Sequence, residues 1–147
     1  YFKDDHSIFY AYMKDSNSKM INLPDGLYEH NKKLYLDYVG YHKKLIASLH
    51  KKLIKKDKDQ SVYLFGAHVF AQYLIEFGLD LNNIVCLLDN DKNKQGKRLY
   101  GTSLRVDSPK ILKDIESPVV ILKAGVYNKE IKDDIIKNIN PNVTFWE

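Results

Sequence analysis

Two stretches of this chain have the residue types and spacing of a nucleotide-binding edge. Gly66-Ala67-His68 lies between the apolar run 61–65 and the helical pattern of residues 69–77. A glycine turn between a buried strand and a helix presents backbone N–H groups to phosphate. Asp89 directly follows the next apolar run, 84–88, near the ~20-residue spacing at which dinucleotide folds place a ribose-binding acid. The pattern therefore predicts a ligand edge of the βαβ type.

The glycine fingerprint is incomplete at one position. A dinucleotide turn needs a first glycine for the tight bend, a second for close approach of pyrophosphate, and a third, or an alanine, for helix packing. Gly66 and Ala71 fit the first and third positions, but His68 occupies the second. Its side chain stands where the diphosphate would approach, so we do not expect NAD to bind in the usual pose. His68 either faces a ligand at this edge or makes a local hydrogen bond at the start of the helix.

A third polar stretch, Lys123 to Asn128, follows the apolar run 119–122. Ligands of parallel α/β sheets bind beyond the carboxyl ends of the strands. The predicted substrate-binding residues are those that follow three of these strands: Gly66, Ala67, His68, Asp89, Asn90, Tyr127 and Asn128. The alternative for Asn90 and Asn128 is that they are only turn and cap residues.

Four or five strands alternate with helices after residue 60, which predicts an α/β fold: a Rossmann-like, mostly parallel sheet with helices on both faces. The strand runs are 61–65, 84–88, 103–106, 119–122 and 143–146. Helices are expected after Gly66, after the capping tract Asp107-Ser108-Pro109, and after Asn128, which can cap the last one. With the strand order 3-2-1-4-5, the polar residues after the strands would face one crevice.

Three regions are predicted along the chain. Residues 1–30 form an irregular N-terminal segment, in which residues 8–13 have the pattern of a short strand and residues 15–18 that of a turn. Residues 31–58 form a long amphipathic linking helix that packs on the sheet. Residues 59–147 form the Rossmann-like domain.

The composition excludes several classes of protein. The 147 residues are 44% hydrophobic and 29% charged, which is typical of a globular chain. No apolar run approaches the ~20 residues of a membrane span, and no signal-peptide pattern is present. The single cysteine, Cys86, forms no internal disulfide and fits a reducing, cytoplasmic setting. Because the first residue is Tyr1 and not Met, we expect a fragment or a processed chain.

The net charge of +4 comes from residues 1–60, which contain 12 lysines and 8 acids, whereas residues 61–147 contain 11 charges of each sign. The excess lies at the end of the linking helix, where the helix dipole favours cations. Its residues are Lys51, Lys52, Lys55, Lys56 and Lys58. Nucleic-acid binding needs a broader basic face with stacking aromatics, so no nucleic-acid partner is predicted. Neither His6 nor His30 has a partner at metal-ligand spacing, and no metal is predicted.

A series of motifs occurs along the second part of the chain in a characteristic order. The motifs are Gly66-Ala67, Leu88-Asp89-Asn90-Asp91, Lys94-Gln95-Gly96-Lys97, Tyr100-Gly101-Thr102, Val106 to Pro109, Val120-Ile121-Leu122, and Tyr127-Asn128-Lys129-Glu130-Ile131. This series resembles the C-terminal domain of S-adenosylmethionine-dependent sugar C-methyltransferases. The resemblance covers residues 60–147, and its most specific part is the tract from Asp89 to Pro109.

This resemblance implies a division of labour between domains. In that family the methyl donor, the catalytic histidines and tyrosine, and a cysteine-rich zinc segment belong to a preceding domain. The chain would then be an accessory domain for polysaccharide biosynthesis, inactive alone, with no catalytic residue and no cofactor of its own. Its partners would be the upstream methyltransferase domain, which binds S-adenosylmethionine, and a nucleotide-sugar in the shared cleft. The alternative is a structural or assembly module that binds no ligand and packs on a catalytic partner.

Overall fold

The computed structural model describes residues 11, 13–14, 17, 22 and 24–147. The strand predicted for residues 8–13 and the turn predicted for residues 15–18 lie largely outside this part of the chain. The chain divides into two units, Tyr1–Leu34 and Tyr35–Glu147. The predicted site belongs entirely to the second unit.

Helix α1 has the bounds Leu27–Lys55, where the sequence predicted residues 31–58. It begins earlier because a tight turn directly precedes it, in which Gly26 adopts a φ of 74° that a residue without a Cβ tolerates. Glu29 lies in the first turn, and Lys52 and Lys55 lie in the last turn. These charges complement the helix dipole at both ends.

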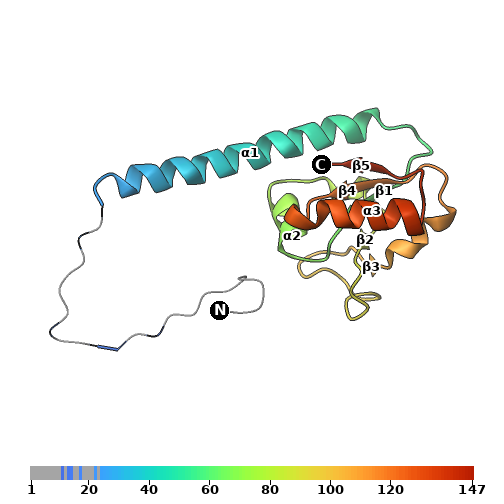
Figure 1. The fold of residues 1–147 in the computed structure, drawn as a ribbon. Helices are drawn as coiled ribbons and strands as arrows, with labels where there is room; N and C mark the ends of the chain where they lie inside the picture. Colours follow the sequence, from blue (N-terminus) through green and yellow to red (C-terminus); the bar gives the residue numbers. More distant parts are fainter. Residues whose placement is uncertain (1–10, 12, 15–16, 18–21, 23) are drawn as a thin grey trace. The chain divides into compact units, whose positions relative to one another are not determined.

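The second unit is built on a five-stranded parallel sheet (Figure 1). The strands are β1 (Val62–Phe65), β2 (Leu87–Leu88), β3 (Val106–Asp107), β4 (Val119–Leu122) and β5 (Thr144–Trp146). Their order is β3-β2-β1-β4-β5, and each neighbouring pair is parallel. This is the order under which the polar residues after the strands were expected to face one crevice. The direction of winding reverses between β1 and β4, and a ligand crevice is expected beyond the carboxyl ends at that point.

Strands β1 and β4 are the centre of the sheet because each is a continuous apolar run, buried at every residue. Strand β2 is shorter than the predicted run 84–88. The residues of that run before β2 still bond to β1, since Val85 N–H donates to the carbonyl of Val62 and Leu64 N–H donates to that of Cys86. The side chain of Val85, however, is 58% exposed, so the run is not buried throughout.

Helices α1 and α2 (Val69–Glu76) cover one face of the sheet. The strand residues facing them alternate with those facing the other side, as expected for a pleated sheet. The cluster on this face includes Ile46, Leu49 and Leu53 of α1, Ala71 and Leu74 of α2, and Leu64, Leu87, Val119 and Ile121 of the sheet. Burying one such leucine side chain contributes about 1.5–3 kcal/mol. The linking helix thus packs on the sheet, as predicted.

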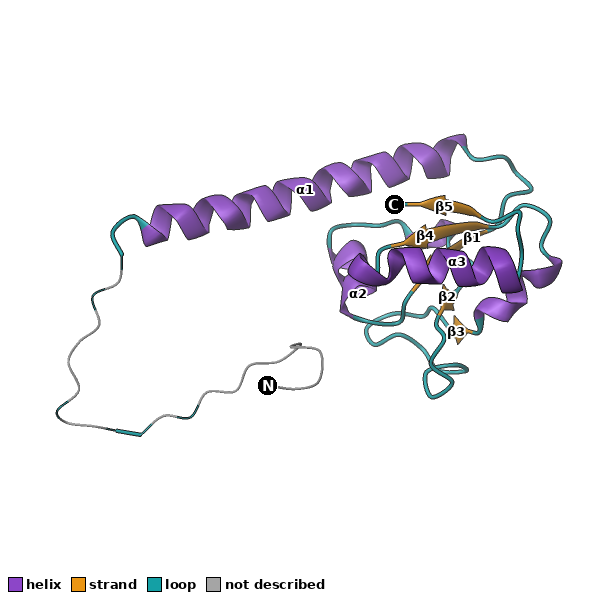
Figure 2. Ribbon diagram, viewed as in Figure 1, coloured by secondary structure: helices purple, strands orange, loops and turns teal. Residues whose placement is uncertain are grey.

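The opposite face is covered by the 3₁₀ helix η3 (Pro109–Asp114) and by α3 (Asn128–Asn138), which crosses in front of the strands in Figure 2. The cluster on this face includes Leu112, Ile135, Tyr63, Phe65, Leu88, Val120 and Leu122. Helices on both faces, as predicted, are confirmed. Two further 3₁₀ turns are η2 (Leu81–Asn83) and η4 (Gly125–Tyr127).

Two helix caps were predicted, and one differs in detail. Ser108 caps η3 by accepting a hydrogen bond from Lys110 N–H, with Pro109 next to it, as the sequence predicted. Asn128 does not cap α3, because it is the first helical residue and Tyr127 occupies the N-cap position. Its side chain instead accepts a 2.7 Å hydrogen bond from the backbone N–H of Ala124. Residue type alone did not distinguish these two positions.

Candidate functional site

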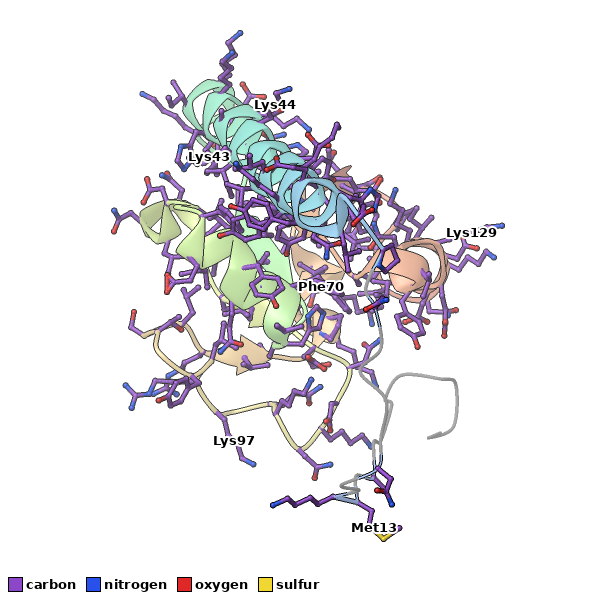
Figure 3. All side chains as sticks on the ribbon, turned by 90° about the vertical axis from the view of Figure 1, so that its left-hand side faces the viewer. Met13, Lys43, Lys44, Phe70, Lys97 and Lys129 are labelled. Atoms are coloured by element: carbon purple, nitrogen blue, oxygen red, sulfur yellow. The ribbon has the colours of Figure 1, made fainter. Side chains whose placement is uncertain are left out.

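The carboxyl ends of β1, β2 and β4 surround a pocket of about 390 Å³, here called the carboxyl-edge crevice. Its lining contains Gly66, His68, Asp89, Asn90 and Tyr127, all of which the sequence singled out. They follow three strands that are adjacent in the sheet but separated in sequence, and the strand order brings them together. Figure 3 views the molecule from this side, with Phe70 of α2, another lining residue, near the middle of the view.

Two of the predicted site residues do not line the crevice. Ala67 donates its backbone N–H to Asp89 Oδ2 at 2.8 Å, so it supports the wall. Asn128 bonds to Ala124 and, through Nδ2, to Glu147 Oε1 at 2.7 Å. Glu147 also pairs with Lys132. Asn128 therefore joins the start of α3 to the end of the chain, which is a structural role.

His68 fills the position of the missing second glycine. Its ring lies against Gly66, where a Cβ would come 2.2 Å from Nε2. Nδ1 accepts a 3.2 Å hydrogen bond from Phe70 N–H, so the side chain caps α2. Of the two alternatives for His68, the local hydrogen bond is present, and the side chain also lines the crevice. The ring occupies the approach that a diphosphate would need at this turn.

The protonation of His68 follows from these contacts. Burial lowers the pKa of His68 below its ordinary value, and the Lys94 ammonium lowers it further, against a smaller opposing effect of Asp89. The ring is therefore neutral at neutral pH. Because Nδ1 accepts from Phe70, its single proton is on Nε2. His68 thus offers a hydrogen-bond donor on the side of Gly66.

Asp89 is the most buried polar residue in the lining of the crevice, at only 7% exposed. Its carboxylate accepts hydrogen bonds from Ala67 N–H at 2.8 Å, Asp91 N–H at 2.9 Å and Lys94 Nζ at 3.0 Å. Burial would raise the pKa of Asp89, but these three donors outweigh it and hold the pKa below its ordinary value. The carboxylate is charged, and most of its acceptor capacity is already used within the chain, two bonds at Oδ2 and one at Oδ1.

Lys94 is a site residue that the sequence reasoning missed. It lines the crevice and pairs with Asp89, which lies five residues before it on the same loop. The loop folds back because Gly96 N–H bonds to the carbonyl of Val106 and Gln95 Nε2 donates to the carbonyl of Asp89. The sequence signal for Lys94 lies in the tract Lys94-Gln95-Gly96-Lys97, one of the motifs of the resemblance.

The lining of the crevice is polar at several points. It includes the imidazole of His68, the amide of Asn90, the ammonium of Lys94, the carboxylate of Glu130 and the aromatic ring of Tyr127. Across the part of the chain that the structure describes, no three His, Cys, Asp or Glu side chains are placed to hold a metal ion. Of the helices among those residues, none is both long enough and apolar enough to cross a membrane.

Comparisons of the chain with protein-family models, with curated proteins and with solved structures found no match.

Proposed function

We propose that residues 59–147 are the Rossmann-like accessory domain of an S-adenosylmethionine-dependent C-methyltransferase that acts on a nucleotide-linked sugar. The observation that supports this most is that Gly66, His68, Asp89, Asn90 and Tyr127 line a single crevice at the carboxyl edge. The same edge contains most of the motifs on which the resemblance rests. In this proposal the crevice borders the nucleotide-sugar in the assembled enzyme.

The proposed domain would contribute binding rather than reaction chemistry. The methyl donor and the groups that transfer the methyl would belong to a preceding domain, with which this one shares the cleft. Asn90 and Tyr127 would contact the sugar or its diphosphate from one side. His68 would orient the ligand with its Nε2–H. The setting would be cytoplasmic polysaccharide biosynthesis.

A second candidate is a structural module that packs on a catalytic partner and binds no ligand. It is favoured by the internal hydrogen bonding of two polar groups at the edge. The carboxylate of Asp89 accepts three hydrogen bonds from its own chain, and Nδ1 of His68 is used as a helix cap. A surface whose polar groups are already paired gains less from a new hydrogen bond. The two candidates make different predictions for Asn90 and Tyr127, which would contact a ligand only under the first.

The deciding experiment is a titration of the ¹⁵N-labelled chain with nucleoside-diphosphate sugars, followed by amide chemical shifts. We expect saturable shifts at residues 66–68, 89–90 and 127, weakened by Asn90→Ala and by Tyr127→Ala. Asn142→Ala and Tyr100→Ala are matched controls, since both residues are exposed and line no part of the crevice. Losing one buried hydrogen bond to the ligand should cost about 1–3 kcal/mol.

The same samples test the division of labour. The chain should neither bind S-adenosylmethionine nor methylate a nucleotide-sugar, and methylated product would contradict the proposal. Shifts that are absent with every nucleotide-sugar, or equal in the controls, would favour the structural module. In an enzyme that contains both domains, unchanged acceptor affinity and turnover for variants of His68, Asn90 and Tyr127 would do the same.

A further inference from the structure

A second hollow, of about 660 Å³, adjoins the carboxyl-edge crevice. Asn90, which follows β2, lines both of them. The walls of the second hollow come from the loop after β2, from η3 and from the end of α3. Its lining includes three lysines, Lys92, Lys110 and Lys113, and we call it the lysine pocket.

The lysine pocket has an excess of positive charge that the protein does not neutralise. Only one acid, Asp134, lines it with the three lysines. No ion pair or side-chain hydrogen bond of Lys92, Lys110 or Lys113 occurs among the described residues. Some lysines of the same unit do pair with acids, as in Lys94–Asp89, Lys132–Glu147 and Lys137–Asp133, whereas the three lysines of the pocket are exposed and gather around one hollow. Residues 61–147 have no net charge, so this concentration of lysines is local.

We propose that the lysine pocket binds the diphosphate of the nucleotide-linked ligand. This inference deepens the proposed function and rests on it for the identity of the ligand. The ordinary place for a diphosphate, the glycine turn after β1, is filled by the ring of His68. Lys94, the lysine in the crevice lining, is already paired with Asp89. A ligand whose sugar reaches the carboxyl-edge crevice would therefore gain from unpaired cations nearby for its phosphates. The lysine pocket meets the crevice at Asn90 and provides one.

The other group of lysines in the unit is a weaker candidate. Lys51, Lys52 and Lys55 line a separate hollow at the end of α1, where the helix dipole is negative and opposes an anion. Lys56, also in that lining, donates to the carbonyl of Gln60 at 2.8 Å. The lysines of that hollow therefore compensate the negative end of the α1 dipole. Of the lysines in the lysine pocket, only Lys113 lies in a last helical turn, that of the short η3, whereas Lys92 is in a loop and Lys110 is near the start of η3.

The test is calorimetric titration of the 147-residue chain with inorganic pyrophosphate at low ionic strength. The test variant is Lys92→Ala/Lys110→Ala/Lys113→Ala. The matched control is Lys43→Ala/Lys44→Ala/Lys97→Ala, which removes the same charge from exposed lysines outside both hollows. Figure 3 shows these three side chains pointing outward from α1 and from the loop after β2. A third variant replaces the pocket lysines with arginine and keeps the charge.

We expect one saturable site for pyrophosphate. The alanine triple should weaken its affinity about tenfold or more, because each exposed ion pair between a lysine and a phosphate contributes a few-fold. The control and the arginine triple should bind as the unchanged chain does. Rising salt should weaken binding, because the site is electrostatic. Equal losses in the test and control triples, or no saturable binding, would overturn the proposal. If pyrophosphate binds as expected but no nucleotide-sugar does, the anion site stands and the proposed function fails.

Discussion

The imidazole of His68 lies on Gly66, so close that a Cβ at residue 66 would be 2.2 Å from Nε2. Gly66 also has a φ of 96°, a conformation that side-chain-bearing residues rarely adopt. The glycine is thus required twice, once by its backbone and once by the ring above it. The turn retains its tight bend, but the ring occupies the space that a dinucleotide turn leaves for pyrophosphate.

The first prediction is that the chain does not bind NAD or NADP. His68 blocks the diphosphate position, and Asp89, the residue that would bind the ribose, is already bonded to Ala67, Asp91 and Lys94. Calorimetric titration with either dinucleotide should give no saturable heat at millimolar concentration. A micromolar dissociation constant would show that the ring moves aside.

The second prediction is that Gly66→Ala destabilises the fold by about 1–3 kcal/mol, through backbone strain and contact with His68. Gly101→Ala is the matched control, because Gly101 has a φ of 77° with nothing near its missing Cβ. Urea unfolding should show a larger loss for Gly66→Ala than for the control. Adding His68→Ala should recover the contact part only. Equal losses at the two glycines would show that the ring does not press on the turn.

Features of the fold and the site that follow from local sequence patterns could be predicted, whereas those that depend on tertiary contacts could not. The alternation of apolar runs with helical patterns predicted the mostly parallel α/β sheet, and the residues after the strands located the crevice. The pairing of Lys94 with Asp89 depends on the path of the loop after β2, which no periodicity encodes. The same holds for Asn128, which is the right type for a cap but lies one position too late. Side-chain direction at such positions is set by tertiary contacts that a single sequence does not display.

The third prediction is that acid removes the contribution of the Asp89 carboxylate to the stability of the fold. The pKa of Asp89 lies below its ordinary value of 3.8, so its stabilising effect is full well above pH 3.8 and is lost as pH falls through the folded-state pKa. At neutral pH, Asp89→Asn should lower the free energy of unfolding by about 1–3 kcal/mol, because its amide group would face the donors that a carboxylate accepts. The exposed Asp114→Asn is the control. Denaturation across pH should show the Asp89→Asn deficit shrinking in acid, and a constant deficit would contradict this account.

The fourth prediction is that Cys86 does not react with thiol reagents in the folded protein. The thiol is buried, and burial together with the Asp107 carboxylate raises the pKa of Cys86 to about 12. Little thiolate, the reactive form, exists at mildly alkaline pH. Labelling should be slow in buffer and fast after addition of denaturant. Rapid stoichiometric labelling without denaturant would show that β2 opens readily.

The last prediction concerns Asn140, a 4% exposed residue that joins the end of α3 to η3. Its Nδ2 donates to the carbonyls of Leu112 and Ile115 at 2.7 and 2.8 Å, and its Oδ1 accepts from Asn142 N–H at 2.8 Å. Asn140→Ala leaves these groups unpaired and should destabilise the fold by about 2–4 kcal/mol. The exposed Asn138→Ala, which removes one bond to Asp134, should cost far less.

Asn140→Asp separates hydrogen bonding from shape at the same site. A carboxylate there can still accept from Asn142 but faces the two carbonyls without a proton to donate. The variant should therefore be destabilised at neutral pH and partly recover in acid relative to Asn140→Ala, because the protonated acid can donate one bond. Urea denaturation of both variants across pH measures this difference. If the aspartate and alanine variants kept the same difference at every pH, packing rather than hydrogen bonding would account for the role of Asn140.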